Sequence, residues 1–313
     1  MPSTSLSPAR VRGALLGTAI GDALGMPIEH LSHQNVRLYY KGIKEYRADE
    51  KRGELDAGQW TGDTQRMLAL ARVLADSATR GGHRERLRGA LNELLPHARR
   101  WEPGLLEALQ QATTFAAPSN GAAVTMAPLG AWLSKAESVD EDKKSDLVPL
   151  MSATHSHPAS VAAAYGHAFA VRAALLAEAD SFNVDAFWEA VHAETLAVER
   201  SSGDTDTSVS DRLAALRDNL DDFPLDLQDA CGGTGVHASE SWPFALAMFA
   251  RNPHLPETTL LSAINVGGDA NSVGALCGAL LGALNGADAF PQAWHDGLEA
   301  RDQILAVADA LMR

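Results

Sequence analysis

Oxygen-bearing side chains gather at three places in the sequence, each close to a run of glycines or to the start of an apolar helical pattern. Carboxylate, amide and hydroxyl oxygens are the ligands that Mg²⁺ and Mn²⁺ prefer in proteins. The three clusters together therefore predict a metal site, provided that the fold brings them into contact. The clusters are Asp22 and Glu29 in "GDALGMPIEH", Thr61, Asp63 and Thr64 in "GQWTGDTQRM", and Asp269, Asn271 and Ser272 in "VGGDANSVG".

The same residue types have simpler uses, and the sequence leaves these open. Thr, Asp, Asn and Ser are preferred at helix N-termini, where a side-chain oxygen accepts a hydrogen bond from a backbone N–H. The candidates for such caps are Thr61 or Asp63 in one cluster and Asn271 or Ser272 in another. The glycine pair before Asp269 allows a third interpretation, a helix start that binds a phosphate.

Helical periodicity runs through most of the chain. Ala and Leu recur at helical spacing in segments such as "MLALARVLAD", "VAAAYGHAFAVRAALLAEA" and "DQILAVADALM", whereas the alternating pattern of strands is almost absent. The sequence therefore predicts an all-α fold of roughly a dozen helices. A length of 313 residues by itself favours about two domains.

Two glycine ladders favour one domain instead. The ladders are Gly13, Gly17, Gly21 and Gly25 near the N-terminus and Gly274, Gly278, Gly282 and Gly286 near the C-terminus. Residues four apart share a helix face, and each helical glycine costs about 1 kcal/mol relative to alanine, so close backbone packing would explain the pattern. We expect the first and penultimate helices to pack directly, which makes residues 1–313 one compact domain. The alternatives are that each ladder packs elsewhere, or that an end glycine is a helix cap.

Composition narrows the class of protein. A formal charge of −14 argues against non-specific nucleic-acid binding, which needs clustered Lys and Arg. The two cysteines, Cys231 and Cys277, form no CxxC motif, which favours a reducing compartment. The N-terminus lacks the pattern of a signal peptide, and the longest apolar stretch, from Val273, is shorter than the roughly 20 residues that span a bilayer. We therefore expect a cytoplasmic protein without a membrane segment.

Two polar segments and two short motifs receive separate interpretations. The segment from Ser32 to Gly58 is long, charged and aperiodic, which is typical of a functional lid or a disordered connection. The charge-dense segment from Ser134 and "GDTDTS" at Gly203 are interpreted as solvated loops. "HSHP" at His155 does not predict zinc, because the cysteines are distant and no HExxH motif is present.

Six motifs follow the order found in the ADP-ribosylglycohydrolases, and the chain resembles this family almost from end to end. The motifs are "GALLGTAIGDALGMPIE", "GQWTGDTQRM", "SNGAAVTMAPLG", "THSHP", "TGVHASESWPFALA" and "VGGDANSVGALCGALLGALNG". The resemblance implies a single compact all-α domain with a two-metal centre. It also implies hydrolysis of the glycosidic bond that joins ADP-ribose to an acceptor.

Positions that match the family's motifs receive roles by this resemblance. Glu29 matches the active-site glutamate near the scissile bond, and Asp63 joins it as a catalytic residue. The implied metal contacts are Thr61, Asp63, Asp269, Asn271 and Ser272, and the implied substrate contacts are Ser119, Asn120, Gly121, His155 and Gly235. Cleavage at C1 of ribose builds oxocarbenium-like charge, which carboxylates stabilise, while a metal acidifies and orients water and ribose hydroxyls.

The chain departs from the family pattern at the metal site. Gly62 and Asn271 stand where the family usually has aspartate, Thr125 where many relatives have arginine, and Val236 where many have an aromatic ring. Two dications about 4 Å apart repel by roughly 16 kcal/mol at an effective dielectric constant of 20, and two carboxylates that would offset this repulsion are missing. We therefore expect one weakly held Mg²⁺ or Mn²⁺, or none. Gly62→Asp combined with Asn271→Asp is expected to restore tighter binding.

The resulting prediction is a metal-assisted hydrolase that acts on ADP-ribose linked to a protein, a nucleic acid or a small molecule. The alternative is a catalytically impaired member of the family, either an ADP-ribose-binding protein or a crystallin-like structural protein. Retention of Glu29, Asp63 and Asp269 favours the enzyme, whereas Gly62 and Asn271 favour the alternative.

Overall fold

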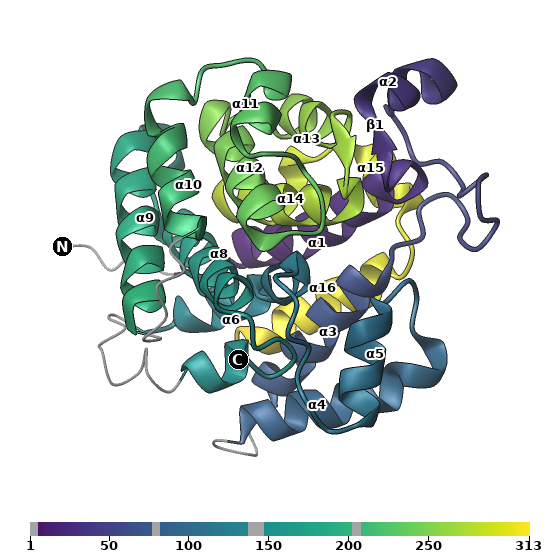
Figure 1. Cartoon of the computed structure of the whole chain (residues 1–313), viewed down its shortest axis with the longest axis vertical. Coiled ribbons are helices and arrows are strands. Elements are labelled where there is room, and N and C mark those ends of the chain that lie inside the picture. The colour runs from purple at the N-terminus through teal and green to yellow at the C-terminus, as the bar shows by residue number, and fades with distance from the viewer. Residues whose placement is uncertain (1–5, 77–81, 137–146, 202–207) are drawn as a thin grey trace.

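The computed structural model describes residues 6–76, 82–136, 147–201 and 208–313, and in these ranges almost all of the regular secondary structure is helical (Figure 1). The all-α prediction is confirmed. The α-helices are α1 (Pro8–Gly25), α2 (His33–Asn35), α3 (Gly62–Ala75), α4 (His83–Leu94), α5 (Pro103–Gln110), α6 (Ala127–Leu133), α8 (Pro158–Leu176), α9 (Val184–Ser201), α10 (Ser208–Leu216), α11 (Pro224–Ala230), α12 (Ala238–Arg251), α13 (Pro256–Ile264), α14 (Ala270–Asn285), α15 (Gln292–Gly297) and α16 (Arg301–Leu311).

Short elements connect these helices. One π-helical turn, η2 (Val36–Tyr40), follows α2. The 3₁₀ turns are η1 (Met26–Ile28), η3 (Leu95–His97), η4 (Asn120–Thr125), η5 (Ala179–Ser181), η6 (Arg217–Asn219) and η7 (Ala287–Ala289). Two strands of two residues, β1 (Leu31–Ser32) and β2 (Gly267–Gly268), complete the described elements.

The glycine ladders lie against each other where α1 and α14 meet near the centre of the molecule (Figure 1). A Cβ atom added to Gly17 would lie 2.0 Å from the carbonyl oxygen of Gly278, and one added to Gly21 would lie 1.9 Å from that of Gly274. Only glycine allows such an approach, so the predicted packing is confirmed. Two α-helices follow α14, however, so it is not the penultimate helix. Gly286, the last glycine of the second ladder, is the C-cap residue of α14 and has a φ of 86°. The alternative interpretation, that an end glycine is a helix cap, is therefore correct for Gly286.

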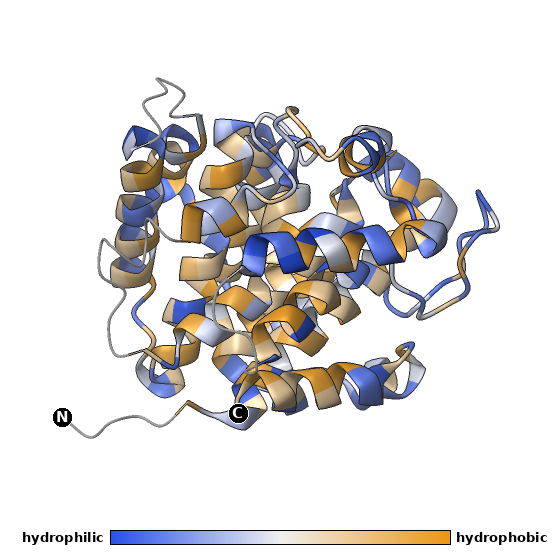
Figure 2. Ribbon diagram, turned by 90° about the horizontal axis from the view of Figure 1, so that it is seen from below, coloured by the Kyte–Doolittle hydropathy of each residue, from blue (hydrophilic) through white to orange (hydrophobic). Residues whose placement is uncertain are grey.

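A continuous apolar core surrounds this helix pair and extends along the chain from Val11 to Leu311. Hydrophobic residues lie mostly toward the interior and hydrophilic residues mostly on the outer helices (Figure 2). Helix α8 is long and apolar enough to cross a membrane, but 78% of its apolar window is buried within the protein. A buried core helix passes the same test, so α8 is weak evidence for a membrane segment.

The strand pair links the segment after α1 to the segment before α14. Leu31 pairs with Gly268 and Ser32 with Gly267, and the backbone N–H of His30 donates to the carbonyl oxygen of Gly268 at 2.7 Å. Both glycines have positive φ, and a Cβ on Gly267 would lie 2.2 Å from the carbonyl oxygen of Leu31. The glycine pair therefore permits the close strand contact between these two segments.

The polar segment from Ser32 to Gly58 projects from one side of the helical body in both views (Figures 1 and 2). The side chain of Asn265 anchors this segment at Ile43. It accepts a hydrogen bond from the N–H of Ile43 at 2.6 Å and donates one to the carbonyl oxygen of Ile43 at 2.9 Å. The hydroxyl of Tyr46 donates to the carbonyl oxygen of Trp294 at 3.0 Å. Most of the two segments predicted to be solvated loops, from Ser134 and from Gly203, lies outside the described residues.

Candidate active site

A cavity of about 560 Å³ opens beside the first turns of α3 and α14. Its wall contains Glu29, which follows η1, Asp63 in α3, and Asp269, the residue before α14. These three acidic residues, far apart in the sequence, are brought together because the glycine ladders align α1 with α14. Four arginines line the same cavity: Arg52, Arg66, Arg99 and Arg100.

Helix α3 begins with two oxygen caps. Thr61 is the N-cap residue, and its hydroxyl oxygen accepts from the N–H of Asp63 at 3.3 Å. A carboxylate oxygen of Asp22, on α1, accepts from the N–H groups of Thr61 and Thr64 at 3.0 and 3.1 Å, and from the Thr64 hydroxyl at 2.7 Å. The capping interpretation is therefore correct for Thr61. Burial, reinforced by the nearby Asp63, raises the pKa of Asp22 to about 7.

Asp63 is the centre of a buried hydrogen-bond cluster. A guanidinium nitrogen of Arg66 lies 2.6 Å from Oδ1, while Oδ2 accepts from the hydroxyl of Ser272 at 2.8 Å and from the amide of Asn271 at 3.2 Å. Burial raises the pKa of Asp63, and Arg66 offsets part of this effect. Asn271 and Ser272 thus reach across from α14 to α3, and the interpretation that they serve only as caps is wrong.

Asp269 occupies the N-cap position of α14 but makes no side-chain cap hydrogen bond. Its Oδ2 atom instead accepts from the amide of Asn120 at 2.6 Å, and that amide also donates to the Ser241 hydroxyl at 2.9 Å. Burial first, and the neighbouring charge of Asp63 second, raise the pKa of Asp269 to about 8. A group that resists ionisation in this way is ready to bind a proton or a cation.

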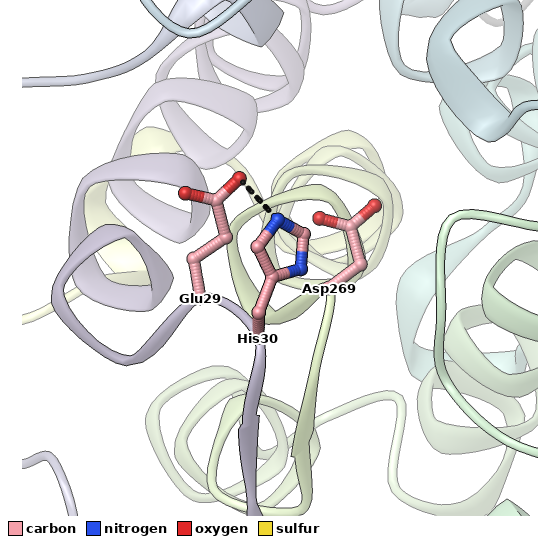
Figure 3. Close-up of side chains that lie close together, drawn as sticks. All are labelled: Glu29, His30 and Asp269. Atoms are coloured by element: carbon pink, nitrogen blue, oxygen red, sulfur yellow. Dashed lines mark ion pairs between the residues drawn. The ribbon is translucent and has the colours of Figure 1, made fainter. Parts of the chain in front are cut away.

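Glu29 and Asp269 flank His30, whose imidazole lies between the two carboxylates (Figure 3). The Nε2 atom of His30 is 3.5 Å from one oxygen of Glu29, and the other oxygen accepts from Arg52 at 2.7 Å and Arg100 at 3.0 Å. One ligand atom from each of Glu29, His30 and Asp269 lies within 4.8 Å of the others, close enough to hold a metal ion. His30 has a φ of 64°, a left-handed conformation that no sequence pattern predicts.

The loop around "SNG" is organised by Glu102, which the sequence analysis missed. The hydroxyl of Ser119 accepts from the N–H of Gly121 at 3.0 Å and donates to Glu102 at 2.7 Å. His155 is fully buried, and its Nε2 atom lies 3.6 Å from the other oxygen of Glu102. A Cβ on Gly121 would lie 3.1 Å from both groups, so glycine lets the loop pass close to them.

Glu102 therefore stands between the cavity and part of the predicted substrate site. Burial acts to raise its pKa, but His155, Arg66 and Ser119 outweigh that effect and lower it, so the group is ionised at neutral pH. His155 does not line the cavity itself but contacts Glu102, which does. His157 caps α8 by accepting from the N–H of Ala159 at 3.2 Å.

The predicted site residues fall into two groups. Those that line the cavity are Glu29, Asp63, Asn120, Asp269, Asn271 and Ser272. Those that lie behind or beside its wall are Thr61, Ser119, Gly121, His155 and Gly235. The N–H of Gly235 donates to Glu240 at 3.1 Å, and the following Val236, 47% exposed, is the residue of that turn that lines the cavity.

The space that a carboxylate at position 62 would need is filled. A Cβ on Gly62 would lie 2.2 Å from Cδ1 of Trp101 and 2.7 Å from the carbonyl oxygen of Arg99. The Trp101 ring is fixed by donation of its N–H to Gln65 at 2.8 Å. An aspartate fits there only if Trp101 and the backbone at Arg99 move, so the tighter binding expected of Gly62→Asp with Asn271→Asp stays a prediction that requires this rearrangement.

Comparison with known proteins agrees with this architecture. The profile of the family described as ADP-ribosylglycohydrolase matches residues 2–313. An uncharacterized protein of Archaeoglobus fulgidus is 28% identical, and the match covers 96% of this chain and 95% of that protein. Human ADP-ribosylhydrolase ARH3 is 28% identical over 133 residues, which cover 39% of this chain and 37% of ARH3. A solved structure described as an ADP-ribosylglycohydrolase-related protein complex matches over 98% of both chains with a TM-score of 0.74 and 26% identity. The chain belongs to the ADP-ribosylglycohydrolase family.

Proposed function

We propose that this protein hydrolyses the glycosidic bond between C1 of an ADP-ribose unit and an acceptor. The observation that carries the proposal is the convergence of Glu29, Asp63 and Asp269 in one cavity. Carboxylates suit a reaction in which positive charge develops at the ribose, because that charge favours the ionised form even of Asp269, whose pKa burial raises to about 8. The cavity volume of about 560 Å³ is within the usual range for a small-molecule site.

The reaction breaks the bond from C1 to the nitrogen or oxygen of the acceptor and forms a bond from C1 to the oxygen of water. One proton of the water must leave, and the acceptor must gain one. In our proposal Glu29 mediates this transfer, since its Oε1 atom is not held by the two arginines. Asp63 and Asp269 stabilise the charge on the ribose, and Asn120 orients Asp269 through their 2.6 Å hydrogen bond.

A single divalent cation fits the donor groups better than two. Glu29, His30 and Asp269 offer a three-ligand set, and the buried Oδ1 atom of Asn271 has no partner in the described structure. We propose that these residues hold one ion, which would acidify and orient a ribose hydroxyl or a water molecule. Because an imidazole nitrogen suits Mn²⁺ better than Mg²⁺, Mn²⁺ is the preferred ion in this proposal.

The test offers ADP-ribosylated arginine, serine and nucleic acid to the protein with Mg²⁺ or Mn²⁺, and measures release of ADP-ribose. Glu29→Gln is expected to lower kcat at least 100-fold with little change in ADP-ribose affinity, because it removes a group that serves the chemical step as proton-transfer group and as ligand of the proposed cation. Asn120→Ala is expected to impair both quantities. Glu54→Gln is the matched control, since Glu54 also lines the cavity, but its side chain is 56% exposed and forms an ion pair with Arg100 rather than with another residue of the proposed site.

The second candidate function is binding of ADP-ribose without turnover. The observation that favours it is the pairing of Glu29 with Arg52 and Arg100, at 2.7 and 3.0 Å, which offsets the negative charge that a proton acceptor needs. Calorimetry with free ADP-ribose separates the two functions. Affinity without hydrolysis of any substrate supports the binding protein, and lack of affinity for ADP-ribose contradicts both.

A further inference from the structure

Arg66 places a positive charge inside the candidate active site, against Asp63, a residue to which the family resemblance assigns a metal contact. The guanidinium and the Asp63 carboxylate are one helical turn apart on α3 and meet at 2.6 Å. Their side chains are only 4% and 8% exposed, so solvent screens the pair weakly. A buried carboxylate with such a partner is already neutralised and gains less from an added cation.

The second oxygen of Asp63 is also occupied. The hydroxyl of Ser272 and the amide of Asn271 both donate to it, at 2.8 and 3.2 Å. The same amide nitrogen lies 3.4 Å from the hydroxyl oxygen of Thr61. A metal ion needs lone pairs directed toward one point, whereas here an N–H group lies at the point where Thr61 and Asp63 converge.

Packing around the ion pair closes the remaining space. Trp101 fills the volume beyond Gly62, as the 2.2 Å approach of a built Cβ to its ring shows. The guanidinium of Arg66 lies 5.9 Å from the centre of the same ring, a favourable arrangement for a cation beside an aromatic face. Gly62, Trp101 and Arg66 thus form one packed unit in place of a carboxylate and a metal.

We propose that Arg66 is a built-in replacement for one of the two metal ions that the family resemblance implies. The residues around Asp63 do not fit an exchangeable ion, and the protein takes up at most one divalent cation, at Glu29, His30 and Asp269. The inference rests on the proposed use of this cavity as the active site. Its test measures metal content, however, so its outcome is independent of turnover.

The experiment titrates the EDTA-treated protein with Mn²⁺ and follows free Mn²⁺ by electron paramagnetic resonance. The unaltered protein is expected to bind no more than one equivalent. Arg66→Gln removes the positive charge beside Asp63 and is expected to add a second equivalent of bound Mn²⁺, or to tighten Mn²⁺ binding at least tenfold. Arg66→Lys keeps this charge and is expected to behave like the unaltered protein. Arg99→Gln is the matched control, because Arg99 lines the cavity but pairs with Glu299.

Two tight Mn²⁺ sites in the unaltered protein, or no gain in a folded Arg66→Gln variant, would overturn the proposal. A second pair of variants covers the case in which Arg66→Gln does not fold. Asp63→Asn is expected to change Mn²⁺ affinity less than threefold and Asp269→Asn to abolish binding; loss of binding in Asp63→Asn would contradict the role of Arg66. A Mn²⁺ site that appears only in Arg66→Gln would support that role and refute the cation site proposed at Glu29.

Discussion

Replacing Gly278 with alanine tests the close contact between α1 and α14 on which the geometry of the site depends. A Cβ at this position would lie 2.1 Å from the carbonyl oxygen of Gly17, and ordinary contact begins at 3.4 Å. The helices must therefore separate by the difference, 1.3 Å, at a point where both are fully packed. Neither partner can yield alone, because the atoms that collide belong to the backbone.

The size of the effect follows from two opposing contributions. Overpacking of a well-packed core costs about 1–3 kcal/mol and occasionally more, while glycine to alanine in a helix gains up to about 1 kcal/mol. Because backbone atoms collide, the cost lies in the upper part of that range, about 2–3 kcal/mol, which leaves a net loss of about 1–3 kcal/mol and a fall in Tm of roughly 2–5 °C for a domain of this size. The separation would also displace Asp269 from Glu29 and reduce any activity of the site.

Gly89→Ala provides the matched control. Gly89 lies in α4, and a Cβ built there meets no heavy atom of the described residues within 4 Å beyond its chain neighbours and its own helix backbone. Only the gain in helix propensity applies, so its Tm is expected to rise by about 1–2 °C. Thermal unfolding followed by circular dichroism measures both variants. A Gly278→Ala protein as stable as the Gly89→Ala protein would refute the argument that the ladder glycines are required by backbone contact.

Three further predictions follow from the buried polar groups. Asp269→Asn is expected to stabilise the EDTA-treated protein by an amount that grows from about pH 4 to about pH 8, by up to about 1.4 kcal/mol for each pH unit. The reason is that the raised pKa of Asp269 makes its ionisation costly in the folded state, and this cost increases as the pH rises. A difference in urea unfolding that does not depend on pH would contradict this. Gly62→Ala is expected to lower stability by about 1–3 kcal/mol in urea unfolding and to alter tryptophan fluorescence, since Trp101 must move. Asn265→Ala is expected to accelerate hydrogen exchange in the segment around Ile43, and unchanged exchange there would show that these hydrogen bonds do not anchor it.

The helical fold could be predicted from the sequence alone, because it depends on the periodicity of apolar residues and on the spacing of glycines. Helical spacing of Ala and Leu reports which face of each helix is buried, and this is a local property of the chain. The glycine ladders added a long-range contact, because a missing Cβ every fourth residue is useful only where another backbone approaches. From that contact followed the meeting of Glu29, Asp63 and Asp269, which the structure places in one cavity.

The tertiary structure alone decided how these groups are partnered. From the sequence, Gly62 is interpreted as the loss of a carboxylate ligand, but Trp101, 39 residues later, fills the space that such a side chain would occupy. The roles of His30 and Glu102 were likewise invisible, since a left-handed φ and a contact across a loop leave no periodic signal. Whether a buried charge faces a metal or an arginine depends on distances between separate helices, and those distances are set only when the core packs.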